Sequence, residues 1–272
     1  MNIPLSPAMQ DKQLKKNIDT IQHKLFIMSG KGGVGKSSVT VNLAVSLMQK
    51  GFRVGILDVD LHGPSIPRLL GLSGHVEVDE QGRMIPVFYN DKLCVVSMDS
   101  FLEKEDTAIV WKGPKKVGAI RQFLSGVYWG NLDFLLIDSP PGTGDEHMAV
   151  LNSIPDAKCI VVTTPQEISL ADVRKALDFL RQIKAPILGI VENMSGLSCP
   201  NCGHEIEIFK KDGGVQLADK ENLLLLGQIS LDPLTVVAAD CGKPVVCMEE
   251  HSEAKEKFLQ LTEATLNALR LI

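Results

Sequence analysis

The chain has 272 residues, of which 44% are hydrophobic and 22% charged, and its formal net charge is −5. This is the composition of a globular protein with one large core, and it lacks the basic excess that is typical of nucleic-acid binding. No apolar run reaches the roughly 18 residues of a membrane-spanning helix, and residues 1–23 lack the apolar stretch of a secretory signal, so we expect a cytoplasmic protein without nucleic-acid or membrane partners.

Residues 1–23 are predicted to be a polar N-terminal extension, and residues 24–272 a single domain. Within that domain, apolar runs of strand length alternate with segments of helical periodicity. The expected strands are Lys24–Ser29, Val54–Leu57, Leu93–Ser97, Phe134–Asp138, Cys159–Thr163, Ile187–Asn193 and Leu223–Ile229. The expected helices are Lys36–Lys50, Lys115–Ser125, Gly144–Asn152 and Ser169–Ile183. Several strand runs are apolar without alternation, which predicts an α/β fold with a mostly parallel sheet and helices on both faces.

Two stretches interrupt this alternation. Residues 71–91 are rich in glycine and polar residues, and they are expected to form a small hairpin near residues 76–87. Residues 195–214 contain the sequence Cys-Pro-Asn-Cys-Gly and are predicted to form a short excursion from the sheet. Cys94 and Cys159 lie inside apolar runs, so we expect both to be core residues.

The segment from Gly30 to Ser38 follows the first expected strand and has the P-loop pattern G-x-x-x-x-G-K-[ST]. In such a loop, consecutive backbone N–H groups surround phosphate oxygens at the N-terminus of a helix. Lys36 is expected to contact the β- and γ-phosphates, and Ser37 to ligate Mg²⁺. The predicted nucleotide-binding residues are Gly30, Lys31, Gly32, Gly33, Val34, Gly35, Lys36, Ser37 and Ser38.

Three aspartates follow expected strands, at the edge of an open α/β sheet where ligands bind. Asp138 is placed like a Walker-B aspartate that holds Mg²⁺, and Asp58 is a second candidate for the metal shell. Asp60 is the candidate that orients the attacking water. The sequence Pro-Pro-Gly-Thr-Gly after Asp138 is expected to present the Gly142 amide to the γ-phosphate.

Cys199 and Cys202 have the C-x-x-C spacing, which places two thiolates on one side of a tight turn. The pair suits zinc, an iron–sulfur cluster or a redox disulfide. Zinc or a cubane cluster needs about four ligands, so the others come from elsewhere in the chain, such as Cys241 and Cys247, or from a second copy.

The P-loop with its additional early lysine resembles the deviant Walker-A ATPases, the group of partition and septum-site ATPases (MinD and ParA) and nitrogenase iron protein. This resemblance implies that Lys31 reaches across a homodimer to the partner's phosphates, where it adds positive charge to the transition state. By this resemblance, the catalytic residues are Lys31, Lys36 and Asp60.

The residues Lys31–Ser38, Asp58–Pro67, Asp138–Asp145 and Cys199–Cys202 together resemble the Mrp/ApbC family of iron–sulfur cluster carrier ATPases. The resemblance implies that Cys199 and Cys202 of two protomers bridge a [4Fe–4S] cluster, which ATP hydrolysis helps to hand to apo-proteins. It also implies that Asn193 contacts adenine, which favours ATP. Two alternatives stay open at this point: a MinD/ParA-like positioning ATPase, and an ATPase with a structural zinc at the dimer interface.

Overall fold

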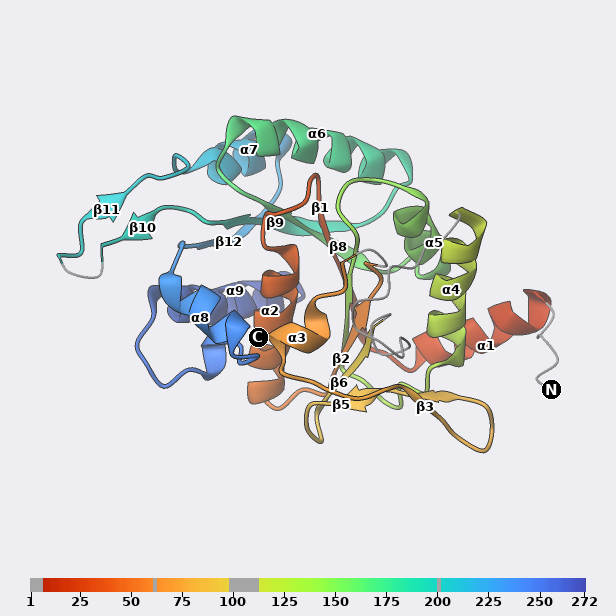
Figure 1. The fold of residues 1–272 in the computed structure, drawn as a ribbon. Coiled ribbons are helices and arrows are strands. Elements are labelled where there is room, and N and C mark those ends of the chain that lie inside the picture. The colour runs from red at the N-terminus through yellow and green to blue at the C-terminus, as the bar shows by residue number, and fades with distance from the viewer. Residues whose placement is uncertain (1–6, 61–62, 98–112, 200–201) are drawn as a thin grey trace.

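The computed structural model describes residues 7–60, 63–97, 113–199 and 202–272. Within these ranges the main sheet has eight strands in the order β12-β9-β8-β1-β7-β2-β6-β5, and only the edge strand β5 runs antiparallel to its neighbour (Figure 1). The strands are β1 (His23–Ser29), β2 (Val54–Asp58), β5 (Val87–Phe88), β6 (Leu93–Ser97), β7 (Phe134–Asp138), β8 (Lys158–Thr163), β9 (Ile187–Asn193) and β12 (Leu225–Ile229). The predicted mostly parallel α/β sheet is therefore confirmed.

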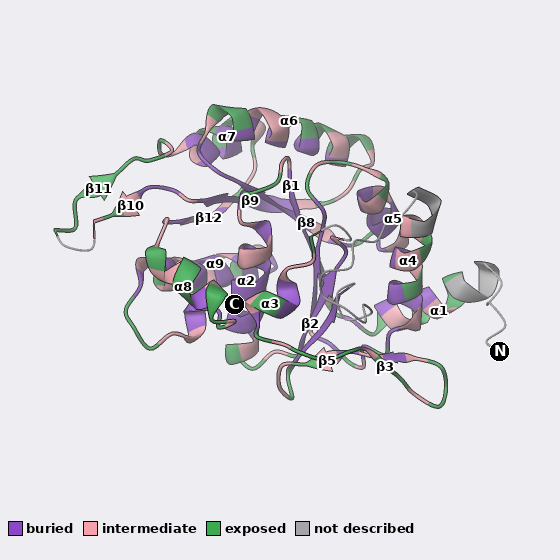
Figure 2. Cartoon of the chain, in the orientation of Figure 1, coloured by how far each residue is buried: buried purple, intermediate pink, exposed green. Residues whose placement is uncertain are grey.

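Helices cover both faces of this sheet, because successive strand residues point to opposite sides. In β1, Phe26 and Met28 join one hydrophobic cluster, while Leu25 and Ile27 join the other. The first face carries α1 (Pro7–Asp19), α4 (Gly113–Gly126), α5 (Asp145–Ser153), α6 (Glu167–Gln182) and α7 (Gly213–Glu221). The second carries α2 (Lys36–Gln49), α3 (Ile66–Leu69), α8 (Pro233–Asp240) and α9 (Glu253–Ala268). Figure 2 shows the buried strands between these partly exposed helix layers.

The N-terminal segment, which the sequence indicates as a polar extension, contains helix α1 and packs on α4. Leu14 and Ile18 are buried in the same cluster as the sheet residues. The Asn17 side chain donates hydrogen bonds to the carbonyl oxygens of Ser125 (2.7 Å) and Val127 (3.1 Å). Part of residues 1–23 therefore belongs to the domain core, although its outward residues are polar.

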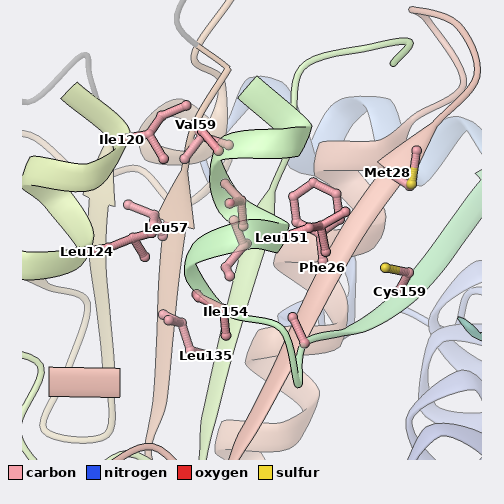
Figure 3. Close-up of a cluster of buried hydrophobic side chains, with 14 of the residues drawn as sticks. Phe26, Met28, Leu57, Val59, Ile120, Leu124, Leu135, Leu151, Ile154 and Cys159 are labelled. Atoms are coloured by element: carbon pink, nitrogen blue, oxygen red, sulfur yellow. The ribbon is translucent and has the colours of Figure 1, made fainter. Parts of the chain in front are cut away.

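The two cysteines expected in the core are buried there, and Cys159 lies beside Phe26 and Met28 (Figure 3). Burial raises the pKa of both the Cys94 and the Cys159 thiol to about 12, so neither thiolate forms near neutral pH. None of the helices in the described ranges is both long and apolar enough to span a membrane.

Both predicted excursions are present. A small antiparallel hairpin pairs β3 (Glu77–Val78) with β4 (Met84–Ile85). A second antiparallel pair, β10 (Leu197–Ser198) and β11 (Glu205–Ile206), extends away from the body of the molecule (Figure 1). We call residues 195–212, which include this second pair, the cysteine arm.

Candidate nucleotide site and cysteine arm

The P-loop connects the end of β1 at Ser29 to the start of α2 at Lys36. Gly35 has a φ of +79°, and a Cβ atom there would lie 2.2 Å from Asn193 Nδ2. A Cβ atom on Gly30 would lie 2.4 Å from the backbone of Asp172 in α6. These two glycines are therefore required by backbone conformation and close packing.

The motif lysine and serine meet Asp138 in one buried cluster at the end of β7. Lys36 Nζ lies 2.7 Å from Asp138 Oδ2, and Ser37 Oγ donates to the same oxygen at 2.6 Å. Thr40 Oγ1 donates to Asp138 Oδ1, also at 2.6 Å. The structure therefore brings together the predicted phosphate-binding lysine, the serine and the Walker-B aspartate. Thr40 was missed by the sequence reasoning, and its signal is the position one helical turn after Lys36.

Asp58 lies beside Asp138, because the two residues pair in register between β2 and β7. It accepts hydrogen bonds from the Asp60 backbone N–H (3.0 Å) and from Ser97 Oγ (3.1 Å). Burial, followed by the neighbouring charge of Asp138, raises the pKa of Asp58 to about 8. A divalent cation would relieve this repulsion, and with the Ser37 hydroxyl the two carboxylates form the oxygen ligand set that Mg²⁺ prefers. These residues fit the predicted metal.

Asp60 and Gly142 lie on two loops that face each other. A cavity of about 410 Å³ is lined by Asp60 and Gly63 from one loop and by Pro140, Pro141, Thr143, Gly144, Glu146 and His147 from the other. The Gly142 N–H donates to the Ser29 carbonyl at 2.9 Å, so in this structure it is bonded to the end of β1. Contact between the Gly142 amide and a γ-phosphate, as the sequence predicts, requires this hydrogen bond to break.

The two lysines of the loop point to different partners. Lys36 pairs with Asp138, whereas Lys31 Nζ lies 3.5 Å from Gln166 Oε1 at the start of α6. Lys31 is only half-buried, while the side chain of Lys36 is 7% exposed. Lys31 is thus placed apart from the buried Asp138 cluster.

Asn193 lies beneath the P-loop at the end of β9. Its Nδ2 donates to the Val34 carbonyl at 2.8 Å, and its side chain is buried. The structure therefore places this side chain against the loop backbone. Its contact with adenine stays a prediction.

Cys199 and Cys202 lie near the tip of the cysteine arm, away from the body of the molecule. Cys199 is half-buried there, and Cys202 is exposed. The Cys199 N–H donates to the His204 carbonyl at 2.9 Å, and the Gly203 N–H donates back to the Cys199 carbonyl at 2.8 Å. These bonds join the residues on the two sides of the C-x-x-C segment. In the ranges that the structure describes, no three His, Cys, Asp or Glu side chains group closely enough to hold a metal ion.

The sequence reasoning also missed Glu192, a fully buried carboxylate in β9. It accepts hydrogen bonds from Ser195 Oγ at 2.5 Å and from Gln228 Nε2 at 2.9 Å, and also from the Gly214 N–H. Its signal in the sequence is a charged residue directly after the apolar run Ile187–Val191 and just before Asn193.

Residues 20–266 match the ParA family, in a branch described as the NUBPL iron-transfer P-loop NTPases. The chain belongs to this family. Its P-loop, its parallel sheet and its buried lysine–aspartate pair are the nucleotide-binding apparatus of a P-loop NTPase.

Relatives and solved structures agree with this assignment. A protein of Methanococcus maripaludis named iron-sulfur cluster carrier protein is 45% identical over 262 residues, covering 96% of this chain and 90% of the relative. A Culex quinquefasciatus protein named cytosolic Fe-S cluster assembly factor NUBP2 homolog is 48% identical over 235 residues, covering 84% of this chain and 91% of the relative. The Archaeoglobus fulgidus nucleotide-binding protein, solved in complex with ADP and with cobalt, is 38% identical with a TM-score of 0.76, covering 90% of this chain and 98% of that one. The cell division ATPase MinD of Pyrococcus furiosus, at 24% identity and a TM-score of 0.65, shares the fold; the comparison covers 89% of this chain and 97% of that one.

Proposed function

We propose that this ParA-family protein is an ATP-hydrolysing carrier of iron–sulfur clusters. The observation that carries the proposal is the pairing of two sites in one chain: a P-loop with a complete Lys36–Ser37–Asp138 cluster, and a cysteine arm with two thiols at its end. The names of the Methanococcus maripaludis and Culex quinquefasciatus relatives support the cargo. The word cytosolic in the second name supports a cytoplasmic location.

The nucleotide is ATP, and the ADP in the Archaeoglobus fulgidus structure supports an adenine nucleotide. The P-loop amides and Lys36 bind the phosphates, and Ser37, Asp58 and Asp138 would hold Mg²⁺. When bound, Mg²⁺ supplies positive charge that stabilises the transferring phosphoryl group. Lys36 leaves Asp138 for the phosphates, and Asp60 orients the attacking water at the wall of the 410 Å³ cavity.

The cluster is cargo, and each chain supplies only part of its site. A [4Fe–4S] cluster is held by about four thiolates, whereas one cysteine arm offers Cys199 and Cys202. Two chains therefore hold the cluster together as a homodimer, each Lys31 reaching the partner's nucleotide. Apo iron–sulfur proteins are the clients that receive the cluster.

Anaerobic reconstitution with iron and sulfide tests this function. We expect about four iron and four sulfide per dimer, a broad visible absorption band, and transfer of both ions to an apo-ferredoxin. C199S/C202S should lose the cluster and the dimer that it bridges, whereas C241S, which changes an exposed cysteine outside the arm, should keep both. A full cluster in C199S/C202S contradicts the proposal.

The same experiment separates the alternatives. A structural zinc at the dimer interface predicts zinc, without iron or sulfide, in metal analysis of the reconstituted protein. A positioning ATPase predicts a nucleotide-controlled dimer that forms without metal at Cys199 and Cys202. The MinD likeness supports only the shared fold.

A further inference from the structure

Glu192 and Asn193 are consecutive residues at the end of β9 whose side chains take opposite faces of the sheet, as neighbours in a strand do. Asn193 contacts the Val34 carbonyl in the P-loop, on the face that carries α2. Glu192 contacts the start of α7, on the other face. The P-loop and the start of α7, which are far apart in the sequence, therefore contact two consecutive residues of β9.

Both ends of the cysteine arm are fastened to Glu192. Ser195 Oγ, at the start of the arm, donates to Glu192 Oε1 at 2.5 Å, and the Gly214 N–H, just past its end, donates to Oε2. Gln228 Nε2 donates both to Glu192 Oε1 and to Asp212 Oδ1, each at 2.9 Å. The buried carboxylate and the half-buried Gln228 amide thus form a clamp across the base of the arm.

The clamp is tightly packed, so a shift of Glu192 has to shift the base of the arm. A Cβ atom on Gly214 would lie 2.9 Å from both Cβ and Oε2 of Glu192. Gln228 pairs with Glu192 in register between β12 and β9. Dense interiors with fully hydrogen-bonded polar groups transmit small displacements instead of absorbing them.

The other side of the link is equally close. Asn193 Nδ2 is 2.8 Å from the Val34 carbonyl oxygen. A Cβ atom added at Gly35 would lie 2.2 Å from the same Nδ2 atom. Between this contact and the arm, Met194 has a φ of +58° and the Ser195 N–H donates to the Ile229 carbonyl at 2.9 Å. The short connection from the P-loop to the clamp is therefore fixed by hydrogen bonds at both ends.

We infer that Glu192 is a positioning residue that couples the P-loop to the cysteine arm, with Asn193 as the contact that senses the loop. Binding of a nucleoside diphosphate or triphosphate moves the Val34 carbonyl, the end of β9 moves with Asn193, and Glu192 moves both ends of the arm. The inference rests on the proposed function in one respect, namely that nucleotide and cargo use these two sites.

The test measures how fast Cys199 and Cys202 are alkylated by iodoacetamide, peptide by peptide, with and without Mg-ADP. In the unchanged chain the rate should differ at least about fivefold between the two states, the low end of typical coupling between sites. In E192Q the two rates should agree within about twofold, while the Kd for ADP stays within about twofold of its original value. Cys241, exposed and outside the arm, reports the reactivity of the reagent.

A matched control is available in a carboxylate that contacts the same arm from helix α9. Glu253 accepts hydrogen bonds from Ser198 Oγ and Ser230 Oγ, both at 2.6 Å, and belongs to α9 rather than to the strand beneath the P-loop. E253Q should change the alkylation rates of Cys199 and Cys202 in both nucleotide states and keep the ratio of the rate with Mg-ADP to the rate without it. If E192Q does not fold, S195A removes one donor to Glu192 and should lower the ratio partway.

The deciding quantity is the ratio of the alkylation rates with and without Mg-ADP. The inference is overturned if folded E192Q keeps the ratio of the unchanged chain, or if S195A keeps it where E192Q does not fold. It is also overturned if ADP changes neither alkylation rate in the unchanged chain. Alkylation needs no iron, so its result is independent of the cargo. A chain that binds no cluster but shows the ADP-dependent ratio loses the carrier function and keeps the coupling. If the unchanged chain reconstitutes a cluster while E192Q keeps the ratio, the carrier function is kept and the coupling is lost.

Discussion

Removing the charge of Lys36 should destabilise the nucleotide-free protein far more than removing the charge of Lys31, although both lysines lie in the same loop. At an effective dielectric constant of about 20, unit charges 2.7 Å apart, the distance from Lys36 Nζ to Asp138 Oδ2, interact by about 6 kcal/mol. Ser37 and Thr40 still donate to Asp138 after the change, which offsets part of the loss. We therefore expect K36M to lower the free energy of unfolding by about 3–5 kcal/mol, as for other broken buried pairs.

The assay is urea denaturation without nucleotide, at pH 7, followed by circular dichroism. K31M is the matched control, because the half-buried Lys31 contacts the uncharged Gln166 and should cost less than about 0.5 kcal/mol. The double variant K36M/D138N should be more stable than the sum of the two single changes predicts, since it leaves no unpaired buried charge. Equal effects of K36M and K31M would refute the reasoning.

Three further predictions follow from the same site. Because the pKa of Asp58 is raised to about 8, the folded state keeps a proton that the unfolded state releases above about pH 4. This group should therefore make the nucleotide-free protein lose stability as the pH rises from about 4 to 8, by at most about 1.4 kcal/mol per pH unit. In denaturation at pH 5–8, D58N should show a flatter dependence of stability on pH, and an equally steep dependence would contradict the assignment. G35A should abolish ADP binding in calorimetry, because its Cβ would lie 2.2 Å from Asn193 Nδ2; the matched G33A, at the same φ of +79° but with nothing within 4 Å, should cost only about 1–2 kcal/mol of stability and fold normally. K31A should reduce ATP turnover at least about tenfold while changing the Kd for ADP little, and unchanged turnover would remove Lys31 from catalysis.

The nucleotide-binding loop could be predicted from the sequence because its chemistry is contiguous. Residues 30–38 contain their own turn-forming glycines, their lysine and the start of their helix, and the strand before them is an unbroken apolar run. The strand ends at Asp58 and Asp138 were predictable for a related reason: buried parallel strands have a distinct apolar pattern, and their polar ends meet at one edge. The C-x-x-C spacing is visible in the sequence because four consecutive residues define it.

The tertiary structure decided what depends on distant partners. Thr40 and Asp138 are 98 residues apart, and neither position alone indicates the hydrogen bond between them. Helix α1 is polar on its outward face, so only its packing on α4 reveals that it belongs to the core. Asn193 could be placed near the nucleotide by resemblance, but its contact with the Val34 carbonyl required the coordinates.

By itself, the sequence of this protein determined the fold class, the P-loop and the cysteine pair, because each is encoded in a local run of residues whose physical requirements are satisfied by near neighbours. Only the tertiary structure decided how those parts are joined. The clamp at Glu192 draws its donors from Ser195, Gly214 and Gln228, which the pairing of β9 with β12 and the packing of α7 on β9 bring together. A hydrogen bond depends on distances of about 3 Å, and such distances between remote segments are set by packing of the whole core.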